Sequence, residues 1–229
     1  MNGKIIVFEG TDGSGKATQK NKLCEYFNKQ GIDYREVTFP RYSEESSALV
    51  RMYLGGEFGS KPTDVPAKTS SVFFAVDRYA SYQKDWKEYY QNGGIIVCDR
   101  YTTSNAVHQT PKLPENEWWD FTDWLFEFEY DLMGIPKPDL VFFMDMPTEY
   151  TLKLIEHRQG NEGDIHEQDH AYLAHCRECA LKIADRYNWK VVHCIKDGQI
   201  RTIDDINSEV CKIADGEIKQ YGIQKIYNR

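Results

Sequence analysis

No apolar run in this 229-residue sequence approaches the ~20 residues that a membrane-spanning helix needs. An excess of positive charge is also missing, because 28 lysines and arginines stand against 36 aspartates and glutamates, for a net charge of −8. This balance argues against general binding to nucleic acid polymers or anionic membranes, although a few arginines and a glycine-rich loop can still form a local site for a small anion. The first residues, MNGKIIVFEG, have no signal-peptide shape and run directly into a strand pattern.

Paired cysteines are absent as well, since the six cysteines are scattered along the chain. Cys98 and Cys194 fall in apolar, strand-like runs, so we expect reduced thiols in a cytoplasmic protein. The segment HAYLAHCREC (170–179) combines histidines with cysteines, which are common zinc ligands. All of them would lie on one predicted helix rather than in two spaced pairs around a turn, so we do not expect a zinc site.

What the sequence does contain is an alternation of strand and helix patterns. Apolar runs rich in β-branched residues predict five strands, at 4–8, 34–39, 94–98, 139–146 and 190–195. Helical periodicity is clearest at 16–30, 66–90, 168–188 and from 203 onward. Near-continuous apolar strands that alternate with helices are typical of a parallel sheet covered on both faces. We therefore predict a three-layer α/β/α fold, with a five-stranded parallel sheet flanked by helices, in which residues 1–229 form a single domain.

The stretch FEGTDGSGKATQ (8–19) lies between the first predicted strand and the first predicted helix. Its glycines let successive backbone N–H groups point at phosphate oxygens, and the helix that follows adds its N-terminal dipole. Lys16 would then bridge the β- and γ-phosphates of ATP as a mobile charge. The expected ATP-binding residues are Gly10, Thr11, Asp12, Gly13, Ser14, Gly15, Lys16, Ala17 and Thr18. The alternative is an ordinary glycine-rich turn between a strand and a helix.

The loop lacks the serine or threonine that the phosphate-loop pattern places after its lysine to bind Mg²⁺, because Ala17 stands there. Mg²⁺ keeps several water ligands and often takes only one or two protein ligands beside the phosphates. Asp99 follows the third predicted strand, at the end of the sheet where ligands bind, and Arg100 comes directly after it. We expect Asp99 to hold, through water, the Mg²⁺ that accompanies ATP. The alternative for these two residues is a surface ion pair at a strand end.

Six segments, in order along nearly the whole chain, resemble the thymidylate kinases, a family of P-loop nucleoside monophosphate kinases. They are FEGTDGSGK (8–16), FPRY (39–42), FFAVDRYA (73–80), CDRYTTSNAVHQ (98–109), PKPDLVFFMDMP (136–147) and HRQGNEGDIHEQD (157–169), the last where the family has its mobile lid. The resemblance implies phosphoryl transfer from ATP to the 5′-phosphate of dTMP, giving dTDP and ADP for dTTP synthesis. Such transfer depends almost entirely on positioning and charge stabilisation.

The resemblance also implies roles for individual residues. The catalytic residues would be Lys16, Asp99, Arg100 and Arg158. Arg41 and Arg100 would clamp the acceptor phosphate, since planar guanidinium groups suit phosphate oxygens. The other expected contacts of dTMP are Phe74 stacked on thymine, Arg78 at O4, Asn105 at N3–H, Phe39, Pro40 and Leu54 as walls, Asp12 at the 3′-hydroxyl and His108 under the sugar. Glu167 in the lid would help with the metal shell or the sugar.

Several of these residues also have a plainer interpretation. Phe39 and Phe74 could be core aromatics, Arg78 a solvated helix charge and Asn105 a helix cap. Two other functions remain open: a kinase for another deoxynucleotide or a deoxynucleoside, and a non-catalytic nucleotide-binding protein. The sequence DRY (99–101) favours an acceptor that already carries a 5′-phosphate, because deoxynucleoside kinases usually have an ERS-like motif after a core strand.

Two departures from the family pattern and one expectation about oligomeric state accompany these matches. His108 stands where the family usually has Tyr or Phe, which puts the distinction between deoxyribose and ribose in question. Family members place a transition-state arginine in the phosphate loop or the lid, but here the loop has none, the lid offers only Arg158 at its edge, and Ile165 stands where an arginine often follows the lid Asp. The family is dimeric, so a homodimer is expected, and the aromatic-rich segment 117–133 either packs in the core or forms a partner surface.

Overall fold

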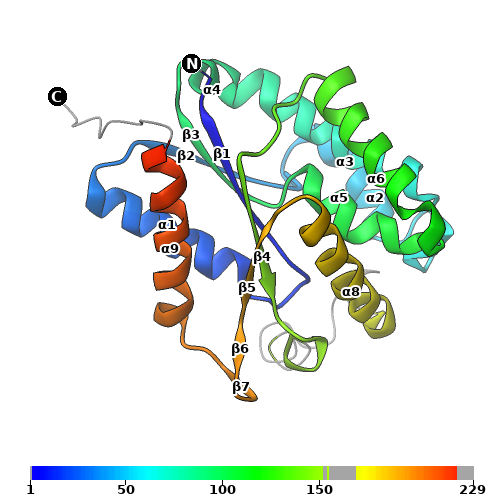
Figure 1. Ribbon diagram of the computed structural model, residues 1–229. Coiled ribbons are helices and arrows are strands. Elements are labelled where there is room, and N and C mark those ends of the chain that lie inside the picture. The colour runs from blue at the N-terminus through cyan, green and yellow to red at the C-terminus, as the bar shows by residue number, and fades with distance from the viewer. Residues whose placement is uncertain (1, 152–153, 155–168, 221–229) are drawn as a thin grey trace.

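The computed structural model describes residues 2–151, 154 and 169–220, and its centre is a five-stranded parallel sheet (Figure 1). The strands lie in the order β2-β3-β1-β4-β5, so the first strand is the middle one. Their bounds are β1 Lys4–Glu9, β2 Tyr34–Thr38, β3 Ile95–Asp99, β4 Leu140–Asp145 and β5 Lys190–His193. The five predicted strands are therefore confirmed, with small shifts at their ends.

Helices cover both faces of this sheet (Figure 1). One layer consists of α1 (Lys16–Gln30) and α9 (Ile203–Gln220), and the other of α3 (Ala67–Ser81), α5 (Thr102–Gln109), α6 (Trp118–Phe126) and α8 (His170–Arg186). Along β1, Ile6 and Phe8 belong to the core on the α1 and α9 side, while Ile5 and Val7 belong to the core on the other side. Burial on both faces explains the continuous apolar strands and confirms the three-layer fold.

The predicted helix at 66–90 is three consecutive helical segments. After α3 the chain continues as a π-helical stretch, Tyr82–Trp86, and then as α4 (Lys87–Gln91). The Trp86 indole is buried and donates to Ser81 Oγ at 3.1 Å. A π-helical turn inserts an extra residue into a helix, and here it brings the large Trp86 side chain into the core. The sequence also gave no expectation for α2 (Ala48–Leu54), which packs against α3.

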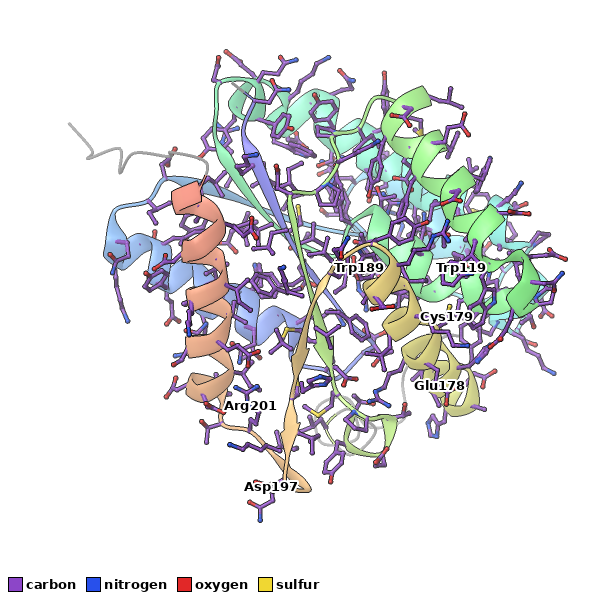
Figure 2. The ribbon with its side chains drawn as sticks, in the orientation of Figure 1. Trp119, Glu178, Cys179, Trp189, Asp197 and Arg201 are labelled. Carbon is purple, nitrogen blue, oxygen red and sulfur yellow. The ribbon has the colours of Figure 1, made fainter. Side chains whose placement is uncertain are left out.

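The predicted strand at 190–195 is split as well. β5 ends at His193, and β6 (Ile195–Lys196) then pairs antiparallel with β7 (Gln199–Ile200) in a hairpin that the sequence analysis did not predict (Figure 2). Asp197 and Gly198 form its turn with positive φ angles of 51° and 73°. Asp-Gly is one of the dipeptides that a two-residue hairpin turn favours, because both central residues need a positive φ.

Three other expectations from the sequence can be compared with the structure. Trp118, Phe121 and Leu125 of α6 are buried in the core, which confirms the core-packing interpretation of this part of 117–133. The six cysteines are free thiols, and Cys179 on α8 is buried (Figure 2). In residues 2–151, 154 and 169–220 no group of three or more His, Cys, Asp or Glu side chains is placed to hold a metal ion, and no helix is long and apolar enough to cross a membrane.

The predicted lid (157–169) lies outside the described residues except for its last residue. This holds for Arg158 and Glu167, whose expected roles therefore stay predictions. Asp169 is the N-cap of α8, and its carboxylate accepts a hydrogen bond from the Tyr172 backbone N–H at 2.9 Å. The helix after the predicted lid thus begins with a standard side-chain cap.

Candidate functional site

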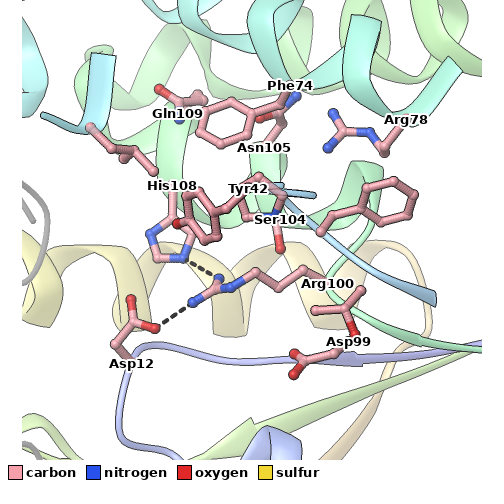
Figure 3. Close-up of a pocket in the computed structure, with 14 residues that line it drawn as sticks. Asp12, Tyr42, Phe74, Arg78, Asp99, Arg100, Ser104, Asn105, His108 and Gln109 are labelled. Carbon is pink, nitrogen blue, oxygen red and sulfur yellow. Dashed lines mark hydrogen bonds and ion pairs between the residues drawn. The ribbon is translucent and has the colours of Figure 1, made fainter. Parts of the chain in front are cut away.

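A pocket of about 420 Å³ opens at the carboxyl ends of β1, β2 and β3 (Figure 3). This is the edge where ligands bind in open parallel sheets. The structure brings together nine of the ten residues that were expected to contact dTMP: Asp12, Phe39, Pro40, Leu54, Phe74, Arg78, Arg100, Asn105 and His108. Asp99, expected near the metal, also lines it. Residues from six different segments therefore meet at the predicted place.

The phosphate loop lies beside this pocket, between β1 and α1. Its glycines take positive φ angles of 147° at Gly10, 78° at Gly13 and 87° at Gly15. A Cβ atom on Gly10 would come within 2.5 Å of Ser14 Oγ and 2.9 Å of the Met144 carbonyl oxygen. Glycine is thus required at this position both for the backbone conformation and for the space.

Lys16 is the buried cation of the loop. Its Nζ donates to the Thr11 carbonyl oxygen at 2.8 Å and lies 3.8 Å from Asp12 Oδ1. Burial and the nearby Arg100 charge together lower the pKa of Lys16 to about 8, although the carboxylates of Asp12 and Asp99 oppose this shift. A buried ammonium group beside a second cation is costly, and the negative charge of a bound triphosphate would offset that cost.

Ser14 gives a second indication that the loop suits phosphate. Its Oγ is buried and has no hydrogen-bond partner among the described residues. A buried hydroxyl without a partner is costly, and an incoming phosphate oxygen would satisfy it. Ala17, at the first turn of α1, is exposed and offers no ligand to a metal, so the oxygen atoms that suit Mg²⁺ here are carboxylates, with Asp99 and Asp12 at the pocket.

Arg100 lies at the centre of the pocket, between Asp12 and His108 (Figure 3). Its Nη2 donates to Asp12 Oδ1 at 2.5 Å, and its Nη1 lies 3.1 Å from His108 Nε2. Burial would raise the pKa of Asp12, but the charges of Arg100 and Lys16 outweigh burial and hold that pKa well below its usual range. The Arg100 backbone has a positive φ of 65°, and its N–H donates to the Phe8 carbonyl oxygen at 3.1 Å. The turn after β3 thereby directs the guanidinium across the sheet edge.

The other end of the pocket is apolar on one side and polar on the other. Phe74 lines it and meets the Tyr53 ring edge-on, with centroids 6.2 Å apart. Arg78 is 1% exposed and forms an ion pair, so it is not a solvated helix charge. Asn105 is buried within α5 and donates to the Ser71 carbonyl oxygen at 3.1 Å, so it is not a helix cap. Phe39 is both buried in the core and part of the pocket wall.

Arg41 is the one expected dTMP contact that does not line the pocket. Its guanidinium forms ion pairs with Asp85 and Asp77, and its backbone N–H donates to Asp77 Oδ2 at 2.8 Å. Both carboxylates come from the helical segments that follow α2, and their charge holds Arg41 outside the pocket wall. Its expected role as a phosphate clamp therefore stays a prediction from the sequence.

Sequence reasoning missed several polar residues of the site. Glu9 is fully buried at the end of β1, where it accepts from Thr103 Oγ1 at 2.5 Å and from Ser104 Oγ at 2.7 Å. Burial raises the pKa of Glu9, although Arg100 and the hydroxyl donors oppose this. Glu129 is the partner of Arg78. Both acids were visible as carboxylates inside strongly apolar stretches, a position that needs a partner.

Comparison with known proteins supports the family resemblance that was inferred from the sequence. The family model described as "Thymidylate kinase" matches residues 8–200. The chain belongs to the thymidylate kinase family. Its members are ATP-dependent nucleoside monophosphate kinases, and phosphorylation of dTMP by ATP is accordingly the activity of this chain. The resemblance inferred from the sequence is confirmed.

Relatives agree with this membership over nearly their full lengths. The thymidylate kinase of Plasmodium falciparum is 26% identical over 210 residues, which cover 92% of this chain and 89% of the relative. The probable thymidylate kinase of Pyrococcus horikoshii is 27% identical over 223 residues, covering 95% and 98%. A solved thymidylate kinase from Candida albicans shares the fold, with a TM-score of 0.70, 21% identity, and coverage of 94% of this chain and 92% of that chain. This structural likeness agrees with the predicted fold class.

Proposed function

We propose that this pocket, together with the phosphate loop, carries out the transfer from ATP to dTMP within one domain. The observation that carries the proposal is the position of Asp12. Its Oδ1 atom is approached by Lys16 Nζ at 3.8 Å and by Arg100 Nη2 at 2.5 Å. The donor-side cation and the acceptor-side cation thus converge on one oxygen, at the place where two phosphates must meet.

On the donor side, Lys16, the loop N–H groups and the Ser14 hydroxyl would bind the β- and γ-phosphates. Asp99, and Asp12 beside it, would hold Mg²⁺ through water in place of the hydroxyl that Ala17 cannot supply. Mg²⁺, when bound, neutralises charge on the phosphates. The predictions for Glu167 in the metal shell and Arg158 as the transition-state arginine stand beside these as proposals from sequence.

On the acceptor side, Arg100 would bind the 5′-phosphate and Asp12 the 3′-hydroxyl of the sugar. Phe74 would stack on the base, while Arg78 and Asn105 would read its edge. Their common position at one end of the pocket, away from Asp12, supports this division into a phosphate end and a base end (Figure 3). His108, next to Arg100, would lie under the sugar.

The decisive experiment measures ADP release from ATP and Mg²⁺ with dTMP, dUMP, dCMP, dGMP, UMP and free thymidine as acceptors. We expect strong turnover on dTMP and little on thymidine. Preference for thymidine would establish a nucleoside kinase instead. Turnover on UMP comparable to that on dTMP would show that His108 relaxes the discrimination between deoxyribose and ribose. Bound ATP with no turnover on any acceptor would leave a nucleotide-binding protein.

We further propose that two copies of the chain associate through α3. Val72, Val76 and Tyr79 are 36%, 44% and 41% exposed, and their spacing places them on one face of that helix. An apolar stripe of this kind suits a second copy of the same helix. We expect Val76→Glu to convert a dimer into a monomer in light scattering, whereas Leu132→Glu, at an exposed apolar residue elsewhere, leaves the mass unchanged. A monomeric wild-type protein would refute the proposal.

A further inference from the structure

Glu129 touches both polar side chains at the base end of the pocket. It lies in the π-helical stretch Glu127–Leu132 that follows α6, and it is fully buried. Its carboxylate accepts from Arg78 Nε at 2.6 Å and from Arg78 Nη2 at 2.5 Å, in the two-pronged geometry that suits guanidinium groups. It also accepts from Thr102 Oγ1 at 2.8 Å and from Asn105 Nδ2 at 3.2 Å. Four donors from two helices thus surround one acceptor.

These contacts decide which atoms are left to face a ligand. Arg78 uses Nε and Nη2 on Glu129, and within the described part of the chain Nη1 makes no hydrogen bond. Asn105 uses its Nδ2 twice, on Glu129 and on the Ser71 carbonyl oxygen at 3.1 Å. Its Oδ1 is therefore the amide atom left for the pocket, which both residues line. The pocket offers a donor at Arg78 and an acceptor at Asn105.

We propose that Glu129 is a positioning residue that sets this donor and acceptor order and thereby selects pyrimidines with a 4-oxo group and an N3–H over 4-amino pyrimidines. The inference rests on the proposed function, in which Arg78 and Asn105 read the base. Thymine and uracil present an acceptor at position 4 and a donor at N3, whereas cytosine presents the reverse. The two side chains match the first pair at both atoms.

The carboxylate is what makes this order rigid. An ionised carboxylate accepts hydrogen bonds and donates none. If the Asn105 amide turned over, its oxygen would face both Glu129 and the Ser71 carbonyl, and two buried acceptors would lose a donor. Cytosine recognition through a reversed Asn105 is therefore disfavoured by a residue that does not itself line the pocket.

The test is Glu129→Gln, which keeps the shape and gives the position a donor as well as an acceptor. We expect kcat/KM for dTMP relative to dCMP to fall by at least ~10-fold, because Asn105 can now turn over. The ratio of dTMP to dUMP should stay unchanged, since both bases have the same 4-oxo and N3–H edge. Each ratio is measured on one preparation, so any loss of folded protein cancels. Glu127→Gln, at an exposed residue of the same π-helical stretch, is the matched control and should alter neither ratio.

Removing one charge of a buried pair is strongly destabilising, so a milder variant accompanies the first. Thr102→Val removes a single hydrogen bond from the same carboxylate, and we expect a smaller fall in the dTMP to dCMP ratio. If Glu129→Gln does not fold, the dTMP to dCMP ratio of Thr102→Val tests the inference instead. An unchanged ratio in the folded variant overturns the inference while the proposed function stands. A wild-type protein without turnover on dTMP overturns the proposed function itself.

Discussion

Lys16→Met is expected to lower kcat with ATP and dTMP by at least ~10³-fold, because the charge that stabilises the transferring phosphoryl group is lost. The fold should survive. Burial holds the pKa of Lys16 at about 8, below its usual value of 10.5, so the folded state opposes the charged form at neutral pH. The methionine side chain fills the same space without a charge. The melting temperature of the variant should therefore equal or exceed that of the wild type.

The control is Lys22→Met, which makes the same exchange at a half-exposed residue of α1. Lys22 lies 3.5 Å from Glu25, and surface ion pairs of this kind contribute little to stability. Steady-state kinetics and thermal unfolding of both variants should separate loss of the phosphate contact from loss of charge in general. If Lys16→Met kept activity within ~10-fold of the wild type, the donor phosphates would have to be bound elsewhere.

Arg100→Asn is expected to reduce kcat/KM for dTMP by about 10³-fold, with a much smaller change in the affinity for ATP. Asparagine is chosen because Arg100 has a positive φ of 65°, a conformation that asparagine adopts more readily than most residues. The variant therefore removes the guanidinium without straining the turn after β3. Asp12 also loses the main charge that lowers its pKa, so a group that was ionised throughout the working pH range begins to titrate at higher pH.

Two further variants define the origin of this effect. Arg100→Lys keeps the charge and loses the planar, two-pronged donor, so we expect an intermediate rate. Arg186→Asn removes an arginine from α8 that pairs with Asp123 at 3.0 Å on the surface, and it should leave kcat/KM unchanged. Equal activity of Arg100→Asn and the wild type in initial-rate assays would refute the assignment of the acceptor phosphate to this end of the pocket.

The phosphate loop was readable from the sequence because its chemistry is contiguous. The strand, the glycines at 10, 13 and 15, and Lys16 all fall within a dozen or so residues, and each local feature predicts the same geometry. The Asp-Gly dipeptide at 197–198 is also a local turn signal, but the apolar run that ends at residue 195 predicts one continuous strand and conceals the break after His193. Local patterns thus gave the sheet, its main helices and the donor side of the site.

The parts that were missed depend on partners far away in the chain. Arg41 is drawn to Asp77 and Asp85, and nothing in the segment FPRY indicates these partners. Glu129 and Arg78 are 51 positions apart, so neither stretch alone predicts the ion pair. Charged side chains that become buried must find compensation in three dimensions, and periodicity carries no information about where it lies.

The position of β1 in the middle of the sheet bears on how the chain acquires its site. β1 pairs with β3 and β4 and with no strand nearer in sequence, since Lys4 lies opposite Ile95 and Ile6 opposite Leu140. During synthesis, the phosphate loop therefore emerges long before the strands that support it. Closing such long stretches of chain is entropically costly and makes folding slow. The glycine-rich loop, although encoded first, therefore gains the two strands that flank β1 only after the chain has been synthesised as far as β4.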